Sequence, residues 1–300
     1  MLNILQKTSE ALRIKEYKER VISYYDVITE PYRQFWGEYF HPAFFEAGDT
    51  LQSALEKTHS LFISDSKLEQ GGSALDLGSG IGSFSFYIAK HAGAKVIGVN
   101  FSRFQLKKAR EQAKKQGYAN VEFIESDIMK FTEPGNCFDA AFLIDVGCHL
   151  PDKAKAVKNI YNLLKPGGRL IIADWLQKDN PTAYEKELLL EPFNELWNYP
   201  YMESLAGYKK IFDEVGFKAI KTLDVSEATK PNWELFYNIA ISEVKTMDWK
   251  KMLRYIANPT ILRQGSKFIE ATKKQFYANL FSKAAFDAEV FRYGYFVVEK

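Results

Sequence analysis

Three glycines spaced two residues apart dominate the segment Asp76-Leu77-Gly78-Ser79-Gly80-Ile81-Gly82. A short apolar strand that starts at Ala74 leads into this segment, and a helix-like segment starts at Ser83. Glycine leaves no side chain where the backbone must turn tightly and a ligand must come close, and the first turn of the following helix presents free N–H groups to that ligand. The pattern therefore predicts a nucleotide site at the carboxyl end of a first parallel strand. A dinucleotide fold would carry a further glycine at Ser83, so the spacing alone is only moderately specific.

Polar side chains follow the next two apolar strands. The strand Val96–Asn100 ends about 20 residues after the turn, where the ribose of a nucleotide would lie. Many such folds have Asp or Glu at this strand end, whereas the amide of Asn100 accepts and donates hydrogen bonds without a charge. The third strand, Val121–Ile124, is followed by Asp127, whose carboxylate can accept from an adenine amino group, and by Ile128, whose N–H can donate to a ring nitrogen.

Further strands alternate with helices along the chain, which indicates a parallel sheet covered by helices. The remaining expected strands are Phe138–Asp145, a turn with a strand at Leu164–Asp174, Lys218–Asp224 and Val290–Val298. The expected helices are 8–22, 83–89, Leu106–Gln116 and Tyr208–Phe217, the last ending at a glycine cap. Residues 20–64 and 232–287 are also expected to be helical, and the insert 181–207 is rich in aromatic and aliphatic residues.

Four more patterns point to one family. They are Tyr24-Tyr25-Asp26 followed by Phe35-Trp36-Gly37 and His41; the run Gly98-Val99-Asn100-Phe101-Ser102-Arg103-Phe104-Gln105; the run from Ile144 to Lys153; and the tail from Gly265-Ser266-Lys267 to Lys300. Together with the glycine turn they resemble the class I S-adenosylmethionine-dependent methyltransferases. Within that class they are similar to the branch of tocopherol and sterol C-methyltransferases and cyclopropane fatty acid synthases. The resemblance covers roughly residues 20–300.

The resemblance implies an α/β fold with a Rossmann-like seven-stranded sheet in the order 3-2-1-4-5-7-6, in which the last strand is antiparallel. It also implies helical lid insertions. The expected division is an N-terminal helical cap at 1–70, a core at 71–228 with a lid insert at 181–207, a second helical lid insert at 229–288, and a final core strand at 289–300.

The resemblance also implies the cofactor, S-adenosylmethionine, which would leave as S-adenosylhomocysteine. Gly78 and Gly80 would contact its methionine portion through their backbone, and Asp76 would orient that portion. Asn100 would face the ribose. The full set expected to bind the cofactor is Asp76, Gly78, Ser79, Gly80, Asn100, Ser102, Gln105, Asp127, Ile128 and Ile144.

A second group of residues is expected on the side of the methyl acceptor. His149, Asp145 and Tyr24 are the candidate catalytic residues, and Tyr25, Trp36, Cys148, Trp175 and Trp197 are the candidate substrate-binding residues. His149 would act as a general base or as an anchor, with a histidine that only bonds backbone at a helix start as the alternative. The branch usually has Glu at Asp145 and often a second acidic residue at Cys148. The shorter carboxylate reaches less far, which puts a role as base or cation stabiliser in question.

Composition limits the partners. The net charge of +2 gives no bulk electrostatic argument for nucleic acid or membrane, and no apolar run reaches the 18 residues of a membrane span. Two cysteines, Cys137 and Cys148, cannot form a disulfide framework, so a reducing cytoplasm is the expected location. The four scattered histidines predict no metal site. We expect a small-molecule substrate, and the sequence leaves a homodimer open.

These observations predict an enzyme that transfers a methyl group from S-adenosylmethionine to a small hydrophobic or aromatic metabolite, with carbon as the acceptor atom by resemblance. The alternatives are an N-methyltransferase of a small natural product, a lipid cyclopropane synthase-like enzyme, and a cofactor-binding protein without methyl transfer. A basic stripe near the C-terminus is expected to be a solvated helix face, with a docking site for a phosphate-bearing or membrane-dissolved substrate as the alternative; it comprises Arg254, Arg263, Lys267, Lys273 and Lys274.

Overall fold

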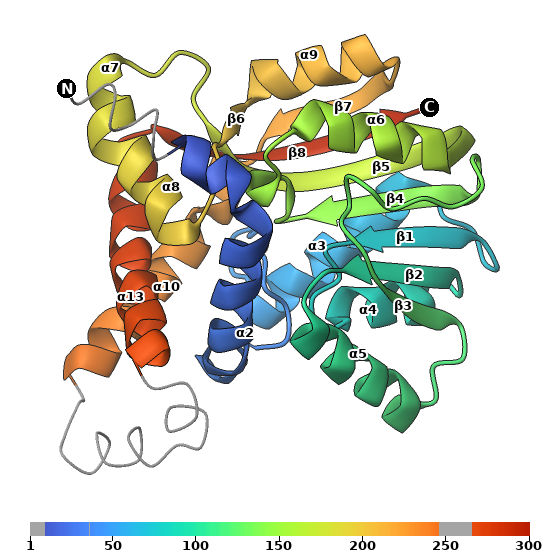
Figure 1. Ribbon diagram of the computed structural model, residues 1–300, viewed down its shortest axis with the longest axis horizontal. Helices are drawn as coiled ribbons and strands as arrows, with labels where there is room; N and C mark the ends of the chain where they lie inside the picture. Colours follow the sequence, from blue (N-terminus) through green and yellow to red (C-terminus); the bar gives the residue numbers. More distant parts are fainter. Residues whose placement is uncertain (1–9, 36, 246–265) are drawn as a thin grey trace.

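A central sheet organises the molecule, for which the computed structural model describes residues 10–35, 37–245 and 266–300. Its strands are β1 Ser73–Leu77, β2 Lys95–Asn100, β3 Val121–Glu125, β4 Phe138–Ile144, β5 Leu164–Gln177, β6 Glu203–Ser204, β7 Lys218–Asp224 and β8 Phe291–Glu299. Their order is β3-β2-β1-β4-β5-β8-β7, and β8 runs antiparallel between β5 and β7 (Figure 1). This confirms the expected Rossmann-like order. The short strand β6 pairs with β5, so the sheet has eight strands and not seven.

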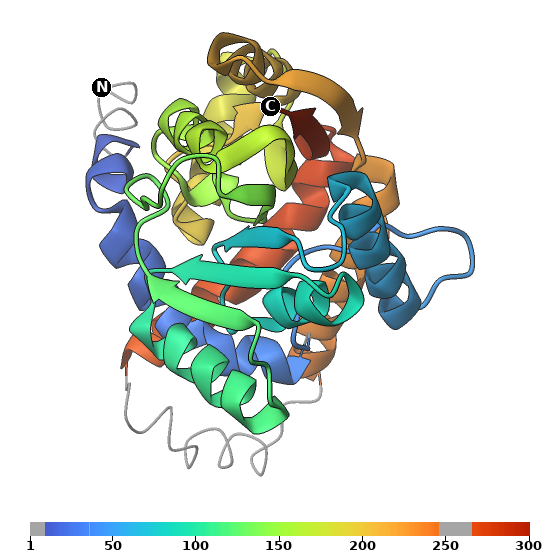
Figure 2. The same cartoon turned by 90° about the vertical axis from the view of Figure 1, so that its right-hand side faces the viewer.

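Strand side chains alternate between two apolar cores, one on each face of the sheet. On β1, Ala74 belongs to one core and Leu75 to the other, and Phe142 and Leu143 on β4 divide in the same way. Helices α3 Leu51–Ser66 and α4 Ser83–His91 pack on the first face, and α6 Lys153–Leu163 and α9 Leu205–Val215 on the second. Helix α5 Arg103–Gln116 covers β2 and β3. Figure 2 shows helices on both sides of the twisted sheet.

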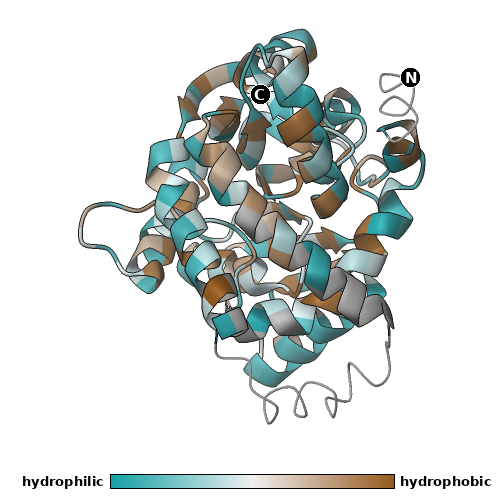
Figure 3. Cartoon of the chain, turned by 90° about the vertical axis from the view of Figure 1, so that its left-hand side faces the viewer, coloured by the Kyte–Doolittle hydropathy of each residue, from teal (hydrophilic) through white to brown (hydrophobic). Residues whose placement is uncertain are grey.

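A further helical layer faces the carboxyl ends of the parallel strands, on the left of Figure 1. It consists of α2 Tyr17–Phe35, α7 Ala183–Glu185, the π-helical turn Lys186–Leu190, α8 Glu191–Trp197, α10 Ser226–Lys245 and α13 Ser266–Asp287. Helix α13 contacts α2, α8 and α10, so segments distant in the sequence form one layer. Hydrophilic and hydrophobic residues are mixed on its outer surface (Figure 3). Among the described residues, no helix is long and apolar enough to cross a membrane.

The structure corrects three local expectations. Residues 37–50 form an irregular loop and not a helix, because Gly37 and Gly48 have positive φ angles and Pro42 cannot continue a helix. The expected helix at 8–22 is interrupted by a turn at Glu16 between helical residues 10–15 and α2. The expected turn at 164–168 lies inside β5, where Gly167 takes the left-handed conformation.

The basic stripe expected near the C-terminus falls mostly outside this description. Arg254 and Arg263 lie outside the described residues, and the side chain of Lys267 is likewise not described. Lys273 is exposed on α13, as a solvated helix face would require, and Lys274 is half-buried.

Candidate active site

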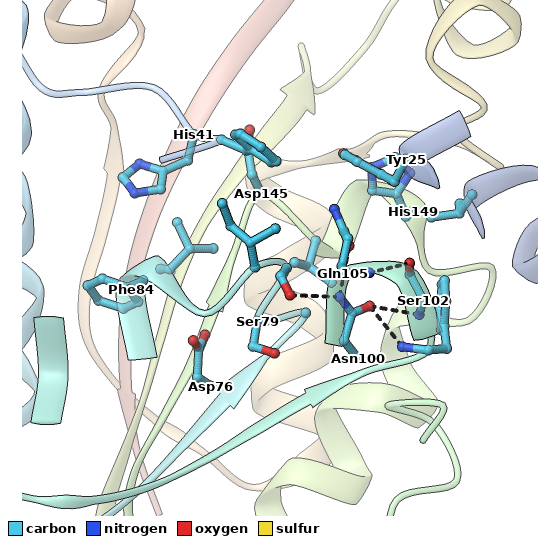
Figure 4. A pocket seen from close by; sticks show the side chains of 18 of the residues that line it. Tyr25, His41, Asp76, Ser79, Phe84, Asn100, Ser102, Gln105, Asp145 and His149 are labelled. Atoms are coloured by element: carbon cyan, nitrogen blue, oxygen red, sulfur yellow. Dashed lines mark hydrogen bonds between the residues drawn. The ribbon is translucent and has the colours of Figure 1, made fainter. Parts of the chain in front are cut away.

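A cavity opens at the carboxyl ends of β1, β2 and β4, and its empty space of about 980 Å³ includes the part that is open to solvent. We call it the cofactor cavity. The expected site residues that line it are Asp76, Gly78, Ser79, Gly80, Asn100, Ser102, Gln105, Ile128, Ile144, Asp145, His149 and Tyr25. Figure 4 shows 18 of its lining residues, ten of them labelled, with Tyr25 beside His149 on one side of the cavity and Asp76 and Ser79 on the other.

The three glycines of the turn differ in what they accommodate. Gly78, Gly80 and Gly82 all have positive φ angles, of 79°, 54° and 87°. A Cβ on Gly78 would lie 2.3 Å from a methyl group of Val146, and one on Gly82 would lie 2.6 Å from the ring of Phe123. A Cβ on Gly80 would meet nothing closer than a backbone oxygen at 4.0 Å. Packing therefore excludes a side chain at the first and third glycines, whereas the second borders open space in the cavity.

Two buried polar groups sit at the base of the cavity. The carboxylate of Asp76 accepts a hydrogen bond from the hydroxyl of Ser85, and burial raises the pKa of Asp76 to about 6. The hydroxyl of Ser79 is buried and has no hydrogen-bond partner among the described residues. Buried hydroxyls are nearly always paired in folded proteins, so an unpaired one that lines a cavity indicates a ligand or an ordered water.

The amide of Asn100 is engaged by the protein itself. Its Nδ2 donates to the carbonyl of Gly80 at 3.3 Å and to Oε1 of Gln105 at 2.9 Å, and its Oδ1 accepts the N–H of Phe101 at 2.8 Å. It therefore ties the glycine turn to the start of α5. With these three hydrogen bonds, Asn100 holds the glycine turn and the start of α5 in place around the cavity. A hydrogen bond to a ribose would replace one of them.

Ser102 and Gln105, which were expected to lie near the ribose with Asn100, form hydrogen bonds with helix α2. The hydroxyl of Ser102 donates to the carboxylate of Asp26, and Nε2 of Gln105 donates to the hydroxyl of Thr29 at 3.0 Å. Ser102 also caps α5 by accepting the N–H of Gln105. These hydrogen bonds join α2 to the start of α5 along this side of the cofactor cavity.

The carboxylate of Asp127 lies behind the cavity wall. It accepts the N–H of Met129 at 2.9 Å and a short hydrogen bond from the hydroxyl of Tyr17 on α2. Tyr17 and Ile128 line the cavity, whereas Asp127 itself does not. Sequence reasoning missed Tyr17, because nothing in a charged helix indicates that this residue contacts a strand end 110 residues away along the chain.

His149 forms a pair with Tyr25 at the edge of the cavity. Its Nε2 lies 3.0 Å from the hydroxyl of Tyr25, and its Nδ1 is buried without a partner among the described residues. Burial lowers the pKa of His149 to about 3, and the nearby charge of Lys153 adds to this effect. The imidazole is therefore neutral at ordinary pH. His149 is the last residue of the 3-10 turn Gly147–His149. Directly after this turn, the carbonyl of Leu150 accepts a hydrogen bond of 3.1 Å from the ammonium group of the buried Lys153.

Asp145 occupies a strained backbone position where β4 ends. Its φ angle is 56°, in the left-handed region that non-glycine residues rarely adopt. Its Oδ1 accepts a hydrogen bond of 2.6 Å from the hydroxyl of Tyr293 on β8. Burial, with the charge of Asp174 close by, raises the pKa of Asp145 to about 8, against the hydrogen bonds from Tyr293 and Trp175. The carboxyl group is therefore mostly protonated at neutral pH.

A second, smaller cavity of about 410 Å³ adjoins the first. We call it the aromatic chamber. It shares Tyr25, Phe40 and Asp145 with the cofactor cavity. Its other lining residues are Tyr24, Ile28, Tyr32, Pro42, Trp175, Trp197, Tyr199, Trp233 and Phe236. They come from α2, the following loop, β5, α8 and α10, so three segments that were expected to form lids converge here.

The remaining expected acceptor residues divide by position. Tyr24, Trp175 and Trp197 line the aromatic chamber. Cys148 is completely buried and lines neither cavity, because its backbone N–H is drawn back to the carboxylate of Asp174 at 3.0 Å. Trp36 lies outside the described residues. The aromatic lining residues of the chamber that sequence reasoning did not single out are Tyr32, Phe40, Tyr199, Trp233 and Phe236, whose only signal was the aromatic content of their segments.

Comparisons with known proteins confirm the resemblance. A family model described as "Methyltransferase domain" matches residues 68–254. The sterol 24-C-methyltransferase ERG6 of Saccharomyces cerevisiae is 33% identical over 61% of this chain, and the chain spans 50% of that protein's length. The 2-methyl-6-phytyl-1,4-hydroquinone methyltransferase of Synechocystis is 29% identical, over 72% of this chain and 71% of that protein. The cyclopropane synthase MmaA2 of Mycobacterium tuberculosis has the same fold, with a TM-score of 0.76 at 16% identity, covering 94% of this chain and 98% of that one.

Proposed function

Because the chain belongs to the methyltransferase-domain family, we propose that it transfers a methyl group from S-adenosylmethionine to a small hydrophobic or aromatic metabolite, at a carbon atom. One observation carries this proposal: the aromatic chamber adjoins the cofactor cavity at Asp145, Tyr25 and Phe40. A methyl donor in one cavity and an apolar acceptor in the other would meet at this junction. Alignment of two reactants in a site closed to water is the main contribution that such a transfer needs from a protein.

The residues present fit the cofactor. The open space at Gly80, the unpaired hydroxyl of Ser79 and the buried carboxylate of Asp76 provide close backbone approach, a hydrogen-bond partner and an acceptor for an amino group. We therefore propose that the turn from Asp76 to Gly80 holds the methionine portion and that Ile128 lies beside the adenine. We further propose that Asp127 accepts from the adenine amino group once Tyr17 releases its carboxylate. When bound, the cofactor supplies an electrophilic methyl group on a positively charged sulfur.

Side chains at the junction would orient the acceptor. Tyr25 is fixed by its hydrogen bond with His149, and Tyr24 packs against the ring of Tyr25 at 5.2 Å between centroids. Aromatic rings beside a positive charge stabilise it by about 0.5–2 kcal/mol, which suits a reaction that starts from a sulfonium ion. The neutral imidazole of His149 and the mostly protonated Asp145 place no fixed negative charge at the junction. This supports a neutral carbon acceptor over a cationic amine.

We also propose that the protein is located in the cytoplasm. Both cysteines are free and Cys148 is buried, which suits the reducing cytoplasm proposed for this protein. A homodimer stays a prediction to be tested by the mass of the protein in solution.

The test is an incubation of the purified protein with S-adenosylmethionine that carries a ¹³C-labelled methyl group, together with pooled extracts of hydrophobic metabolites. We expect S-adenosylhomocysteine to form in step with a product that is heavier by one labelled methyl group. The ¹³C chemical shift of that group then separates attachment to carbon from attachment to nitrogen or oxygen. Binding of the cofactor with no turnover in any extract would instead favour a protein that binds the cofactor without methyl transfer.

A further inference from the structure

Three tryptophans of the described ranges line the aromatic chamber, and their indole N–H groups differ in whether they have a hydrogen-bond partner. The indole of Trp175 is hydrogen-bonded to the carboxyl group of Asp145. The Nε1 atoms of Trp197 and Trp233 are buried and have no hydrogen-bond partner within the described part of the chain. Both side chains are more than nine-tenths buried, with 7% and 2% of their surface exposed, and both residues line the chamber.

We infer that the indole N–H groups of Trp197 and Trp233 recognise an oxygen atom of the methyl acceptor, so that the acceptor is an oxygen-bearing ring compound such as a phenol or a ketone. This inference rests on the proposed function, because it identifies the chamber as the acceptor site. It goes further in naming the two donors and the chemical group that they bind.

The unpaired donors require an explanation. A buried N–H without a partner costs the folded protein about 1–3 kcal/mol, and most buried donors in folded proteins are paired. Phenylalanine, an aromatic residue without an N–H, would not carry this cost. Two such donors from separate elements, Trp197 at the end of α8 and Trp233 in α10, border one cavity. A ligand oxygen that accepts from either indole would remove the corresponding penalty on binding.

Other polar groups around the chamber point to the same class of acceptor. The hydroxyl of Tyr25 is paired with His149, and that of Tyr199 with the thiol of Cys148. The carboxyl group of Asp145 is occupied by Tyr293 and by the indole of Trp175. Among the described residues, the buried polar side-chain atoms of this chamber without a partner are the two indole N–H groups, which are donors, and a ligand group that accepts hydrogen bonds matches them. An ammonium group has only donors and does not.

The test compares two probes of nearly equal shape, 1-naphthol and 1-methylnaphthalene, by calorimetry on the protein saturated with S-adenosylhomocysteine. In the unaltered protein we expect 1-naphthol to bind about tenfold more tightly than 1-methylnaphthalene. Trp197→Phe and Trp233→Phe should each reduce this ratio at least threefold. Each change also opens space in the chamber, which affects both probes, so the ratio reports the lost donor. The control Phe236→Leu alters the chamber wall without removing a donor, so it should weaken both probes and leave the ratio unchanged.

Two outcomes would overturn the inference: a ratio near one in the unaltered protein, as expected if ordered water satisfies the indoles, or a ratio that both tryptophan variants leave intact. If one variant fails to fold by circular dichroism, the other still decides. Methyl transfer is measured separately with labelled cofactor. A protein that methylates an acceptor but shows no preference for the hydroxyl group would disprove this inference and leave the proposed function standing.

Discussion

Asp145→Asn tests whether the carboxyl group at the junction is held protonated by its surroundings. Asparagine tolerates the left-handed backbone at this position, and its amide oxygen can still accept the hydroxyl of Tyr293, so the change removes little except the ionisation. In the folded protein the pKa of Asp145 is about 8, whereas an unfolded Asp has a pKa of about 3.9. Between these two pH values the folded state holds one proton more than the unfolded state. The stability of the unaltered protein must therefore fall as pH rises through this window, and the penalty is complete above pH 8.

The magnitude follows from the shift. Each unit of pKa corresponds to about 1.4 kcal/mol, which gives on the order of 5 kcal/mol over the whole window, and water in the cavities reduces this to about 2–4 kcal/mol. Urea denaturation of both proteins at pH 5 and pH 8 measures the effect. We expect the advantage of Asp145→Asn over the unaltered protein to be larger at pH 8 than at pH 5 by about 2–3 kcal/mol. Asp213→Asn, on the exposed surface of α9, is the matched control and should not change the pH dependence. An advantage of equal size at both pH values would refute the reasoning.

Three further predictions concern the cofactor cavity. Gly80→Ala should weaken cofactor binding about tenfold in a folded protein, because the added Cβ would enter the space in which the cofactor approaches the backbone of Gly80. Gly117→Ala imposes a similar φ strain outside the cavity, so calorimetry should show that it leaves cofactor binding unchanged. Asp127→Ala should cost about 1.5–3 kcal/mol in cofactor binding and Tyr17→Phe well under half of that, and equal losses would speak against an adenine contact. His149→Ala should raise the KM of the acceptor with little change in kcat, because a group with a pKa of about 3 is a weak base; a loss of kcat by about 10²–10⁴-fold would show that it acts as one.

The order of the sheet could be predicted because it depends on local patterns. Each parallel strand is a short apolar run bounded by a turn, and the glycine turn identifies the first strand. The strand β6 could not be predicted, since Glu203–Ser204 is too short to show any periodicity. The loop 37–50 was misassigned for a related reason: its aromatic residues lack strand alternation, and only Pro42 and two glycines indicate that it is not a helix.

The cofactor half of the site was predictable where residues follow strands directly. Asp76, Gly80, Asn100 and Ile128 all line the cavity because the carboxyl ends of parallel strands meet at one edge of a sheet. Their hydrogen-bond partners were not predictable. The partner of Ser102 comes from α2, a helix whose charge pattern looks the same whether it lies against the core or in solvent.

The acceptor half shows where sequence reasoning ends and why. Two strands and a helix separate Trp197 from Trp233 along the chain, and both would be read as ordinary core residues, since large aromatic side chains are usually buried. Only the fold shows that they border one cavity. It also shows that Trp175, whose ring lies 5.8 and 4.5 Å from theirs, donates its N–H to Asp145. What the chamber can bind thus depends on which of the three indole N–H groups already has a hydrogen-bond partner. This is decided by how distant segments pack together, and no sequence motif shows it. The family match over residues 68–254 includes all three tryptophans without assigning them a role, so the identity of the acceptor has to be read from contacts such as these.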